Sequence, residues 1–297
     1  MKYITIGHAA YDITLPIEEF PKENTKNRVS SLVECGGGPA SNAAYLLGLW
    51  GCNTYFSGVL GNDYYGKKIK KEFDDIKVKT TYLELLDNYK TNSSYIMANI
   101  NTGDRTILTY REKKLDNIER KIDEKFDAIL VDGDEYFLSN YILNNNKDAI
   151  SVIDAGRFDK SVVALGKLVK YFICSKEFAE KFSKEKIDIH NTRILKKVYD
   201  DLTIYFENKV IITLGSFGCF LKQEDYLLIP SIEVKSIDTT GAGDIFHGAF
   251  LYFITNGYPL LSSCYLSNVA GALSTTKIGG RNSMPTLEEV LKYADII

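Results

Sequence analysis

Short apolar runs and longer helical or polar stretches alternate along much of this chain. Apolar runs of strand length lie at residues 3–7, Phe126–Val131, Ala149–Ile153, Lys170–Cys174 and Val210–Leu214, and mostly helical or polar stretches separate them. Buried strands that alternate with helices at this rhythm predict a parallel sheet with right-handed crossovers and helices on both of its faces. We therefore expect an α/β fold with a doubly wound, mainly parallel sheet in three layers.

A second group of strand-forming residues does not alternate with helices. Residues 94–100 and 105–111 flank Asn101-Thr102-Gly103-Asp104, which is a strong hairpin signal. Residues 12–17 and 28–34 also have the character of strands. These segments predict a small sheet, built from about residues 12–34 and 90–112, that is set apart from the α/β body. With 45% apolar residues, we expect one main domain over residues 1–297.

A glycine-rich turn meets a helix in the last quarter of the chain. Residues 232–237 alternate like a strand, whereas apolar residues between positions 245 and 253 recur at helical spacing. Between them, Gly241 and Gly243 would let the backbone approach a ligand closely. The unpaired amides of a first helical turn attract anions such as phosphate, so the turn predicts an anion-binding site.

Asp244 lies in the first turn of this helix and has two interpretations. Beside a bound phosphate, its carboxylate could act as a general base that accepts the proton of an attacking hydroxyl group. It could instead be a capping residue, since acidic residues are common in first helical turns. The residue pattern leaves both interpretations open.

A second glycine-rich stretch, from Cys35 to Asn42, also leads into a helix. We expect Ser41 to be the N-cap of that helix and Gly51 to end it. Three glycines before a helix indicate packing as readily as ligand binding. Asp12 follows the first strand, at the kind of strand end where ligands gather in α/β sheets, although a turn aspartate explains it too.

The segment Gly61–Lys68 has the spacing of a phosphate-binding P-loop but lacks its metal-binding hydroxyl group. Lys68 occupies the position that requires serine or threonine, and the helix that follows is amphipathic and basic. We therefore do not expect a P-loop NTPase.

Composition and charge argue against several other classes. The net charge is −3 and no long basic run is present, so nucleic acid is not an expected partner. The five cysteines are scattered without metal-ligand spacing, so neither a disulfide framework nor a zinc site is expected. No apolar run reaches the length of a membrane span and no leader sequence precedes the first strand, so we expect a cytoplasmic protein without a membrane partner.

Together these motifs resemble the signatures of the ribokinase-like, PfkB-type carbohydrate kinases. The resemblance covers nearly the whole chain and is most specific at residues 238–249. In that family an anion hole holds the transferring phosphate and the next aspartate deprotonates the sugar, and these roles fall here on Gly241, Ala242, Gly243 and Asp244. The resemblance assigns the sugar to Asp12, Gly37, Gly38 and Asn42. It also implies that the small sheet is a lid, through which a homodimer can form.

The same resemblance implies ATP and metal ions as cofactors. It assigns ATP to Thr213, Gly215, Gly218 and Asn268. The family's Asn-x-x-Glu metal motif is altered, because Cys174 stands at the asparagine position and only Glu177 remains to hold Mg²⁺ through water. A surface glutamate at a helix start is the alternative for Glu177. The resemblance also implies a monovalent cation, for which K⁺ is the candidate, at Asp238, Thr240 and Ser283.

These motifs predict a kinase that phosphorylates a small sugar, with Asp244 as its general base, and three alternatives are kept. A nucleoside kinase of the same fold would need an apolar pocket, to which Tyr11, Tyr95 and Tyr110 could contribute. A sugar- or nucleotide-sensing protein would not need Asp244. A nicotinamide-dependent oxidoreductase fits least, since no GxGxxG motif follows the first strand.

Overall fold

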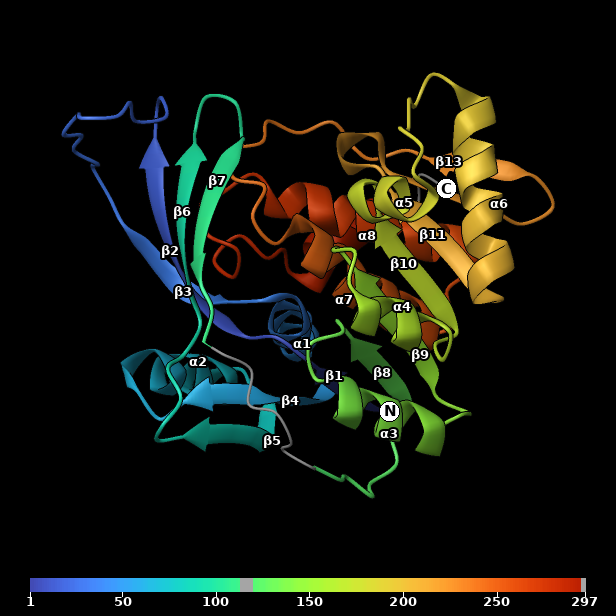
Figure 1. The fold of residues 1–297 in the computed structure, drawn as a ribbon, viewed down its shortest axis with the longest axis horizontal. Helices are drawn as coiled ribbons and strands as arrows, with labels where there is room; N and C mark the ends of the chain where they lie inside the picture. Colours follow the sequence, from blue (N-terminus) through green and yellow to red (C-terminus); the bar gives the residue numbers. More distant parts are fainter. Residues whose placement is uncertain (113–119, 295–297) are drawn as a thin grey trace.

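The computed structural model describes residues 1–112 and 120–294, and a nine-stranded sheet forms its centre (Figure 1). The strands lie in the order β13-β12-β11-β10-β9-β8-β1-β4-β5. Neighbouring strands are parallel except at one edge, where β12 pairs antiparallel with β11 and β13. The strands are β1 (Lys2–Ile6), β4 (Asn53–Gly61), β5 (Lys79–Leu86), β8 (Ala128–Val131), β9 (Ile150–Ala155), β10 (Tyr171–Ser175), β11 (Lys209–Thr213), β12 (Cys219–Lys222) and β13 (Tyr226–Ile229).

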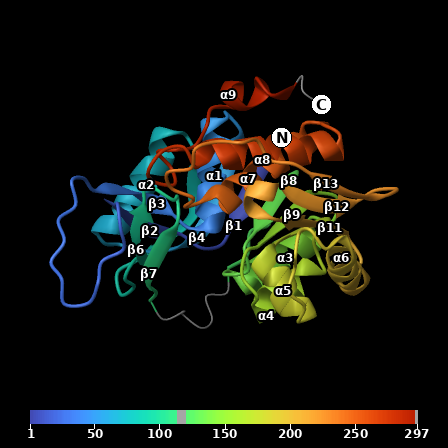
Figure 2. The same cartoon turned by 90° about the horizontal axis from the view of Figure 1, so that it is seen from above.

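Helices cover both faces of this sheet, so the body has three layers (Figure 2). One face carries α1 (Pro39–Leu49), α2 (Tyr64–Asp75), α7 (Ala242–Thr255) and α8 (Leu260–Ser274), and α9 (Leu287–Leu291) packs on α8. The other face carries α3 (Tyr136–Asn145), α4 (Lys160–Gly166), α5 (Lys176–Ser183) and α6 (Thr192–Phe206). The predicted doubly wound fold is therefore confirmed.

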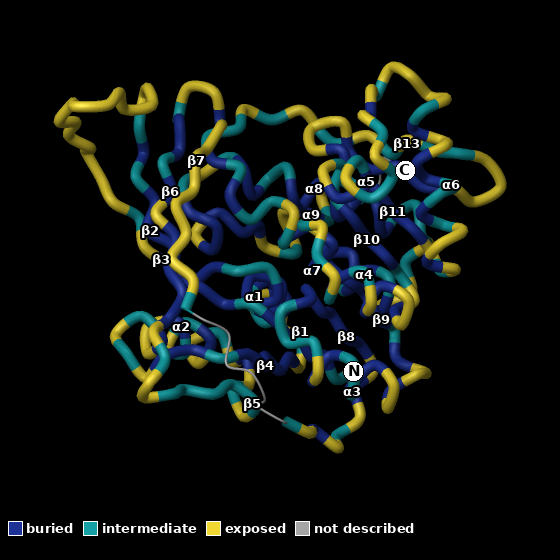
Figure 3. Tube along the Cα trace, viewed as in Figure 1, coloured by how far each residue is buried: buried dark blue, intermediate teal, exposed yellow. Residues whose placement is uncertain are grey.

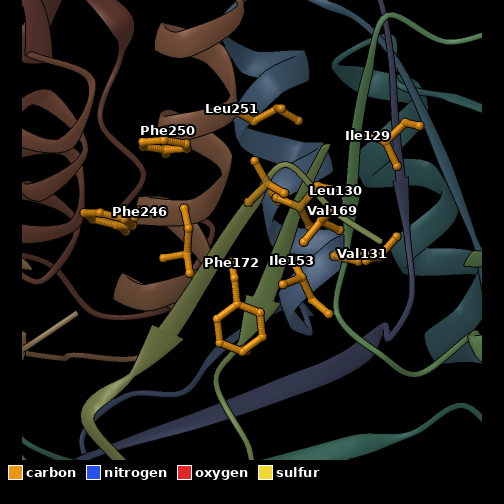
Figure 4. Close-up of a cluster of buried hydrophobic side chains, with 14 of the residues drawn as sticks. Ile129, Leu130, Val131, Ile153, Val169, Phe172, Phe246, Phe250 and Leu251 are labelled. Carbon is orange, nitrogen blue, oxygen red and sulfur yellow. The ribbon is translucent and has the colours of Figure 1, made fainter. Parts of the chain in front are cut away.

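The strands of the central sheet supply much of the core, and helices on both faces pack against them; Figure 4 shows a part of it. Leu130, Ile153 and Phe172 on the strands are completely buried, as are Phe250 and Leu251 on α7. Strands that are covered on both faces need continuous apolar runs, which is why they could be recognised in the sequence. Burying each side chain of this size contributes about 1.5–3 kcal/mol relative to leaving it exposed. The four strands predicted in the middle of the chain correspond to β8, β9, β10 and β11.

A separate four-stranded sheet lies beside the body, in the order β3-β2-β6-β7 (Figure 1). Its strands are β2 (Ala10–Ile17), β3 (Val33–Gly37), β6 (Ser93–Asn99) and β7 (Arg105–Tyr110). The hairpin turns where predicted, because the Asn99 side chain accepts the amides of Asn101 and Thr102, and Gly103 adopts a φ of 76°. The predicted small sheet is confirmed, although residues 18–32 connect its first two strands without forming a strand themselves.

The start of α1 differs from the prediction that Ser41 is its N-cap. The helix begins at Pro39, and Gly38 stands at the N-cap with a φ of 94°. Asp132, which follows β8, accepts the Ala40 amide at 3.2 Å and so replaces a local cap. Proline at the first helical position fits this start, since its missing N–H is not needed there. Ser41 is buried inside the first turn instead.

Residues 232–237 do not form the strand that their alternation predicts. They run as an irregular segment between β13 and the Gly241 turn, where Ile232, Glu233 and Val234 line a cavity. Alternation is a local signal, whereas a strand also needs a neighbouring strand to receive its hydrogen bonds. In the opposite sense, β4 and β5 were not predicted, because polar residues or glycine interrupt their apolar residues. The strands β12 and β13 were not predicted either, because each has only four residues.

The order of the chain reverses at β1, which creates a topological switch point at the carboxyl ends of β1 and β8. From β1 the sheet grows through β4 and β5 on one side and through β8, β9 and β10 on the other. Figure 3 shows that these central strands are buried, whereas exposed segments gather in loops and at the outer end of the small sheet. Ligands of open α/β sheets bind at a switch point of this kind.

No helix of the described residues is long and apolar enough to cross a membrane.

Candidate active site

The glycine-rich turn at the start of α7 is held by one buried carboxylate. Asp238 accepts the Thr240 amide through Oδ1 and the Gly279 amide through Oδ2, both at 2.9 Å. Gly241 adopts a φ of 79°, a conformation that favours glycine, and α7 begins at the next residue. The first amides of a helix have no partner within it, so this turn presents donors in a fixed arrangement. The arrangement suits an anion.

Asp244 projects from the first turn of α7 and contacts the second glycine-rich region. The side-chain amide of Asn42 donates a hydrogen bond of 2.8 Å to its Oδ2. Burial raises the pKa of Asp244, and the charge of Asp154 raises it further. The hydrogen bond from Asn42 and the charges of His247 and Arg105 oppose this rise. A general base works best with a pKa near the working pH, so this environment suits proton transfer.

Asp12 on β2 approaches the same region from the small sheet. Its carboxylate packs directly over Gly37, where a Cβ atom would come within 1.9 Å of Oδ2. Burial raises the pKa of Asp12 to about 7, and the nearby charge of Asp244 adds to the rise. Asn42 Oδ1 is also buried and has no hydrogen-bond partner among the described residues. Since buried polar atoms ordinarily have partners, Asp12 and Asn42 are suited to the hydroxyl groups of a ligand.

A cavity of about 590 Å³ opens beside the same turn. Ala242, Gly243 and Phe246 of α7 line it, and its volume is typical of small-molecule sites. The residues that the sequence assigned to a nucleotide also line it together: Thr213, Gly215, Gly218 and Asn268. The structure therefore gathers the proposed nucleotide residues on one side of the anion-binding turn and Asp12 with Asn42 near Asp244.

Two glycines of the cavity wall are needed for different reasons. A Cβ atom on Gly218 would lie 2.0 Å from the Ile229 carbonyl oxygen, so this position packs against backbone. Gly215 adopts a φ of 62°, and a Cβ atom there would meet no atom of residues 1–112 and 120–294 within 4 Å. Asn268 closes the wall by donating hydrogen bonds to the carbonyl oxygens of Ile229 at 3.0 Å and Pro230 at 3.2 Å. Gly215 thus borders the open space in which a ligand can reach the backbone.

Sequence reasoning missed Arg105, which reaches the anion-binding turn from the small sheet. It is the first residue of β7, and its guanidinium donates a hydrogen bond to the Thr239 hydroxyl group. Arg105 also lines the cavity, and its positive charge lowers the pKa of Asp244. A cation at this position suits the transfer of an anionic group. Nothing near Arg105 in the sequence marks it, because Thr239 is 134 residues away.

Arg281 is the second residue that sequence reasoning missed. Its guanidinium is buried over Gly36, lies against two aromatic rings and pairs with Glu72 of α2 at 2.5 Å. It also donates a hydrogen bond to the Ser41 hydroxyl group, while Glu72 accepts the Gly36 amide. A buried charge is tolerated only when it is paired in this way. Arg281 therefore ties the loop after α8 to β3 and α1, which carry the acceptor-side residues.

Glu177 lies in the first turn of α5, outside the residues that line the cavity. Its side chain is 67% exposed and pairs with Lys181 at 2.6 Å. Cys174 is buried in β10, and burial raises the pKa of its thiol, so it does not replace the missing asparagine as a ligand. Within residues 1–112 and 120–294, no group of three or more His, Cys, Asp or Glu side chains is placed to hold a metal ion. The role of Glu177 in holding Mg²⁺ through water therefore stays a prediction.

The residues expected to hold a monovalent cation lie on two loops that Asp238 joins. Thr240 Oγ1 is buried and has no hydrogen-bond partner in the described part of the chain. Ser283 is also buried and donates to the Gly280 carbonyl oxygen at 3.0 Å. An unpartnered hydroxyl oxygen beside a buried carboxylate fits a cation that prefers oxygen ligands.

Comparison with known proteins relates this geometry to one family. A family model described as "pfkB family carbohydrate kinase" matches residues 2–287. A nucleoside kinase from Methanothermobacter thermautotrophicus is 21% identical over 306 residues, which cover 97% of this chain and 94% of the relative. The structure of a candidate ribokinase from Agrobacterium tumefaciens has a TM-score of 0.91 at 24% identity and covers 99% of this chain and 97% of its own. A ribokinase from Arabidopsis thaliana, solved with ribose and ATP, has a TM-score of 0.80 at 20% identity and covers 98% of both chains.

Proposed function

The chain belongs to the pfkB family of carbohydrate kinases, and from this membership we propose that it transfers the γ-phosphate of ATP to a hydroxyl group of a small sugar of ribose or fructose type. The observation that carries the proposal is the hydrogen bond between Asn42 and Asp244. It joins the acceptor-side residues to the turn that borders the cavity. The fold shared with a ribokinase solved with ribose and ATP supports ATP as the donor.

In the proposed reaction, Asp12 and Asn42 bind sugar hydroxyl groups and direct one of them towards Asp244. Asp244 accepts the proton of that hydroxyl while its oxygen attacks the γ-phosphorus. The bond between the γ-phosphorus and the oxygen that bridges it to the β-phosphate breaks, and ADP leaves with the bonding pair. The amides of Gly241–Gly243 and the guanidinium of Arg105 stabilise the negative charge on the transferring group.

Metal ions would support this arrangement without replacing any protein group in it. When bound with the nucleotide, Mg²⁺ would offset the negative charge of the phosphates. We assign Glu177 to the water molecules of this ion, and Asp238, Thr240 and Ser283 to a monovalent cation such as K⁺. The unpartnered Thr240 hydroxyl supports the second assignment.

The small sheet is proposed to act as a lid that excludes water from the transferring phosphate. The contact between Arg105 and Thr239 supports this role, because it joins the lid to the anion-binding turn. The outer face of the sheet exposes Tyr95, Leu108 and Tyr110, of which Leu108 is 60% exposed. We propose that this face pairs with a second copy of the chain. Light scattering is expected to give a dimer for the wild type and a monomer for Leu108→Asp, and a monomeric wild type would contradict the pairing.

A nucleoside kinase is the second candidate, because one of the relatives has that activity in its name. A nucleoside would need a platform for its base. The three tyrosines considered for this purpose, Tyr11, Tyr95 and Tyr110, lie on the face of the small sheet opposite Asp12, since side chains alternate between faces along the paired strands. Tyr11 is also stacked on Tyr65, with ring centroids 4.5 Å apart. This arrangement favours a sugar.

A panel of sugars and nucleosides, incubated with ATP and the full-length chain, tests the proposal. Phosphorus NMR of the products identifies the acceptor and its modified hydroxyl group. We expect a phosphorylated sugar from the wild type. Turnover of nucleosides alone would support the second candidate, and ATP binding without turnover of any acceptor would indicate a sensing protein.

A further inference from the structure

His247 is a buried titratable residue that the proposed reaction does not use. It lies on α7 one turn after Gly243 and is 2% exposed. Its Nδ1 lies 2.6 Å from the Gly243 carbonyl oxygen and 3.1 Å from Oδ2 of Asp154 on β9. Its Nε2 lies 3.2 Å from the Ile173 carbonyl oxygen on β10. All three neighbours are oxygen atoms that can accept hydrogen bonds.

The number of donors on His247 depends on its protonation. A neutral imidazole has one N–H donor and one acceptor nitrogen, whereas an imidazolium donates from both nitrogens. The carbonyl oxygens of Gly243 and Ile173 can only accept, so a neutral ring would set a nitrogen lone pair against one of them. A proton on Asp154 would not remove this conflict, because Gly243 would still face an unprotonated Nδ1. The geometry therefore fits an imidazolium that is paired with a carboxylate.

Asp154 supplies the negative charge that this pair needs. It is buried, and its Oδ1 accepts the Gly156 amide at 3.0 Å while its Oδ2 faces His247. Burial raises the pKa of Asp154 and lowers that of His247, so each group alone would tend to be neutral. As a pair they offset each other's charge. Buried ion pairs seldom add stability over an apolar core, which favours a role for this pair in the site.

We propose that His247 is an imidazolium at neutral pH and acts as a positioning residue for the turn that carries Asp244. Because a trans peptide group is planar, a hydrogen bond that fixes the Gly243 carbonyl also fixes the direction of the Asp244 N–H. That amide belongs to the first turn of α7, which binds the transferring group. The charge of His247 also lowers the pKa of Asp244, and this favours the deprotonated base.

Charged groups from several elements surround this pair and Asp244. Asp244 on α7 acts on His247, and Arg157 acts on Asp154. Arg105 on β7 and Asp12 on β2 interact with Asp244. From α1 the neighbouring group is the neutral Asn42, and β10 presents the Ile173 carbonyl. If His247 lost its charge, the negative charges of Asp154 and Asp12 would still act on Asp244. The pKa of Asp244 would therefore rise.

The protonation state of His247 can be measured without any activity assay. The chain has three histidines, so ring nitrogen NMR of the full-length protein resolves them, with His247→Gln and His190→Gln to assign the signals. Both ring nitrogens of His247 are expected to carry a proton at neutral pH. An unprotonated ring nitrogen at neutral pH would overturn the proposal. This spectrum of the wild type decides the matter even where His247→Gln fails to fold.

The kinetic consequence rests on the proposed function of Asp244 and is measured by the pH profile of kcat. Asp244 and His247 are three positions apart on α7, where Cβ atoms lie about 5–6 Å from each other. Loss of a charge at this range moves a carboxyl pKa by about one to two pH units. In His247→Gln the acid limb is expected to move up by this amount, with a rate close to that of the wild type at alkaline pH. An acid limb that stays at its wild-type position would overturn the effect of the His247 charge on Asp244.

Two controls separate this inference from the proposed function. His190 is exposed, so His190→Gln is expected to keep both the rate and the acid limb of the wild type. If Asp244→Asn retained full turnover, the proposed base would be wrong, while the NMR result for His247 would still stand. The failure of one proposal is thus distinct from the failure of the other.

Discussion

Helices α1 and α7 begin with the same sequence signature, glycines directly before the first turn, but their N-termini have different surroundings. At α1, Pro39 has no amide hydrogen, and the Asp132 carboxylate accepts the amides of Ala40 at 3.2 Å and His8 at 2.7 Å. Among the described residues, no side chain caps α7, and a Cβ atom on Gly243 would meet none of their atoms within 4 Å. The protein fills the first N-terminus and leaves the second open.

This difference shows why glycines before a helix predict a binding site only weakly. The carboxylate that closes α1 comes from 92 residues away, so the local sequence carries no sign of it. At α1 the glycines instead allow close packing, with Asp12 over Gly37 and Arg281 over Gly36. The open N-terminus of α7 is therefore the better candidate for the transferring phosphate, and α1 for the support of the acceptor.

The largest effect on kcat is expected from a change at Asp244, which lies in the first turn of α7. Asp244→Asn is expected to lower kcat by roughly 10²–10⁴, the usual contribution of a positioned general base. ATP affinity is expected to stay close to that of the wild type, because Asp244 does not line the cavity. Steady-state kinetics and calorimetric titration of ATP check both expectations. A variant with native kcat would show that Asp244 only caps α7.

The second prediction compares Gly243→Ala with Gly37→Ala. The added methyl on Gly243 meets no atom of the described part of the chain within 4 Å, so the fold is expected to keep its stability or gain up to about 1 kcal/mol. The same methyl enters the space beside the anion-binding amides, and kcat is expected to fall by about 10² or more. In Gly37→Ala the methyl displaces the Asp12 carboxylate, so a rise in the KM for the sugar is expected instead.

Chemical denaturation and kinetics of both alanine variants provide the measurement. The contrast between α1 and α7 fails if Gly243→Ala loses stability. That result would mean that other protein groups fill the N-terminus of α7, as they do at α1. The contrast also fails if Gly37→Ala raises the KM for ATP while the KM for the sugar is unchanged.

A smaller effect is expected from Asp12→Asn, and it depends on pH. Loss of a charged acceptor for a sugar hydroxyl group is expected to raise the KM for the sugar by an amount equivalent to about 1–3 kcal/mol. In the folded protein the pKa of Asp12 is about 7, against 3.8 for an ordinary aspartate. The folded state therefore keeps a proton that the unfolded state has lost, and stability falls as pH rises between these two values.

Asparagine cannot ionise, so Asp12→Asn is expected to remove this part of the pH dependence. The variant should be more stable than the wild type above pH 7, by a few kcal/mol at most, and should approach it towards pH 4. Urea denaturation across this range measures the difference. Parallel pH profiles for the two proteins would show that Asp12 is ionised in the folded state throughout.

Much of the fold could be predicted because its signals are local. The apolar run Val210–Leu214 and the Asn101–Asp104 turn each carry their own pattern, and both were placed within a residue or two. The glycine turn before Asp244 could be identified for the same reason. Arg105 and Arg281 could not, since their partners Thr239 and Ser41 lie 134 and 240 residues away. Such contacts follow from the packing of the small sheet and the last loop, which no local pattern encodes.

The smallest expected effect concerns Glu177, which the sequence assigned to Mg²⁺ and the structure places on the surface of α5. Its exposed pair with Lys181 contributes at most about 0.5 kcal/mol, so Glu177→Gln is expected to leave stability unchanged. If Glu177 orders the water molecules of the ion, the variant should need about tenfold more Mg²⁺ for half-maximal rate, since such outer contacts commonly matter by 10–100-fold.

Lys181→Met is the matched control, because it removes the same ion pair but keeps the carboxylate. Titration of the rate with Mg²⁺ at fixed MgATP compares the three proteins. Identical curves for the wild type and Glu177→Gln would mean that Glu177 is a surface residue at a helix start, and that the metal is held without it.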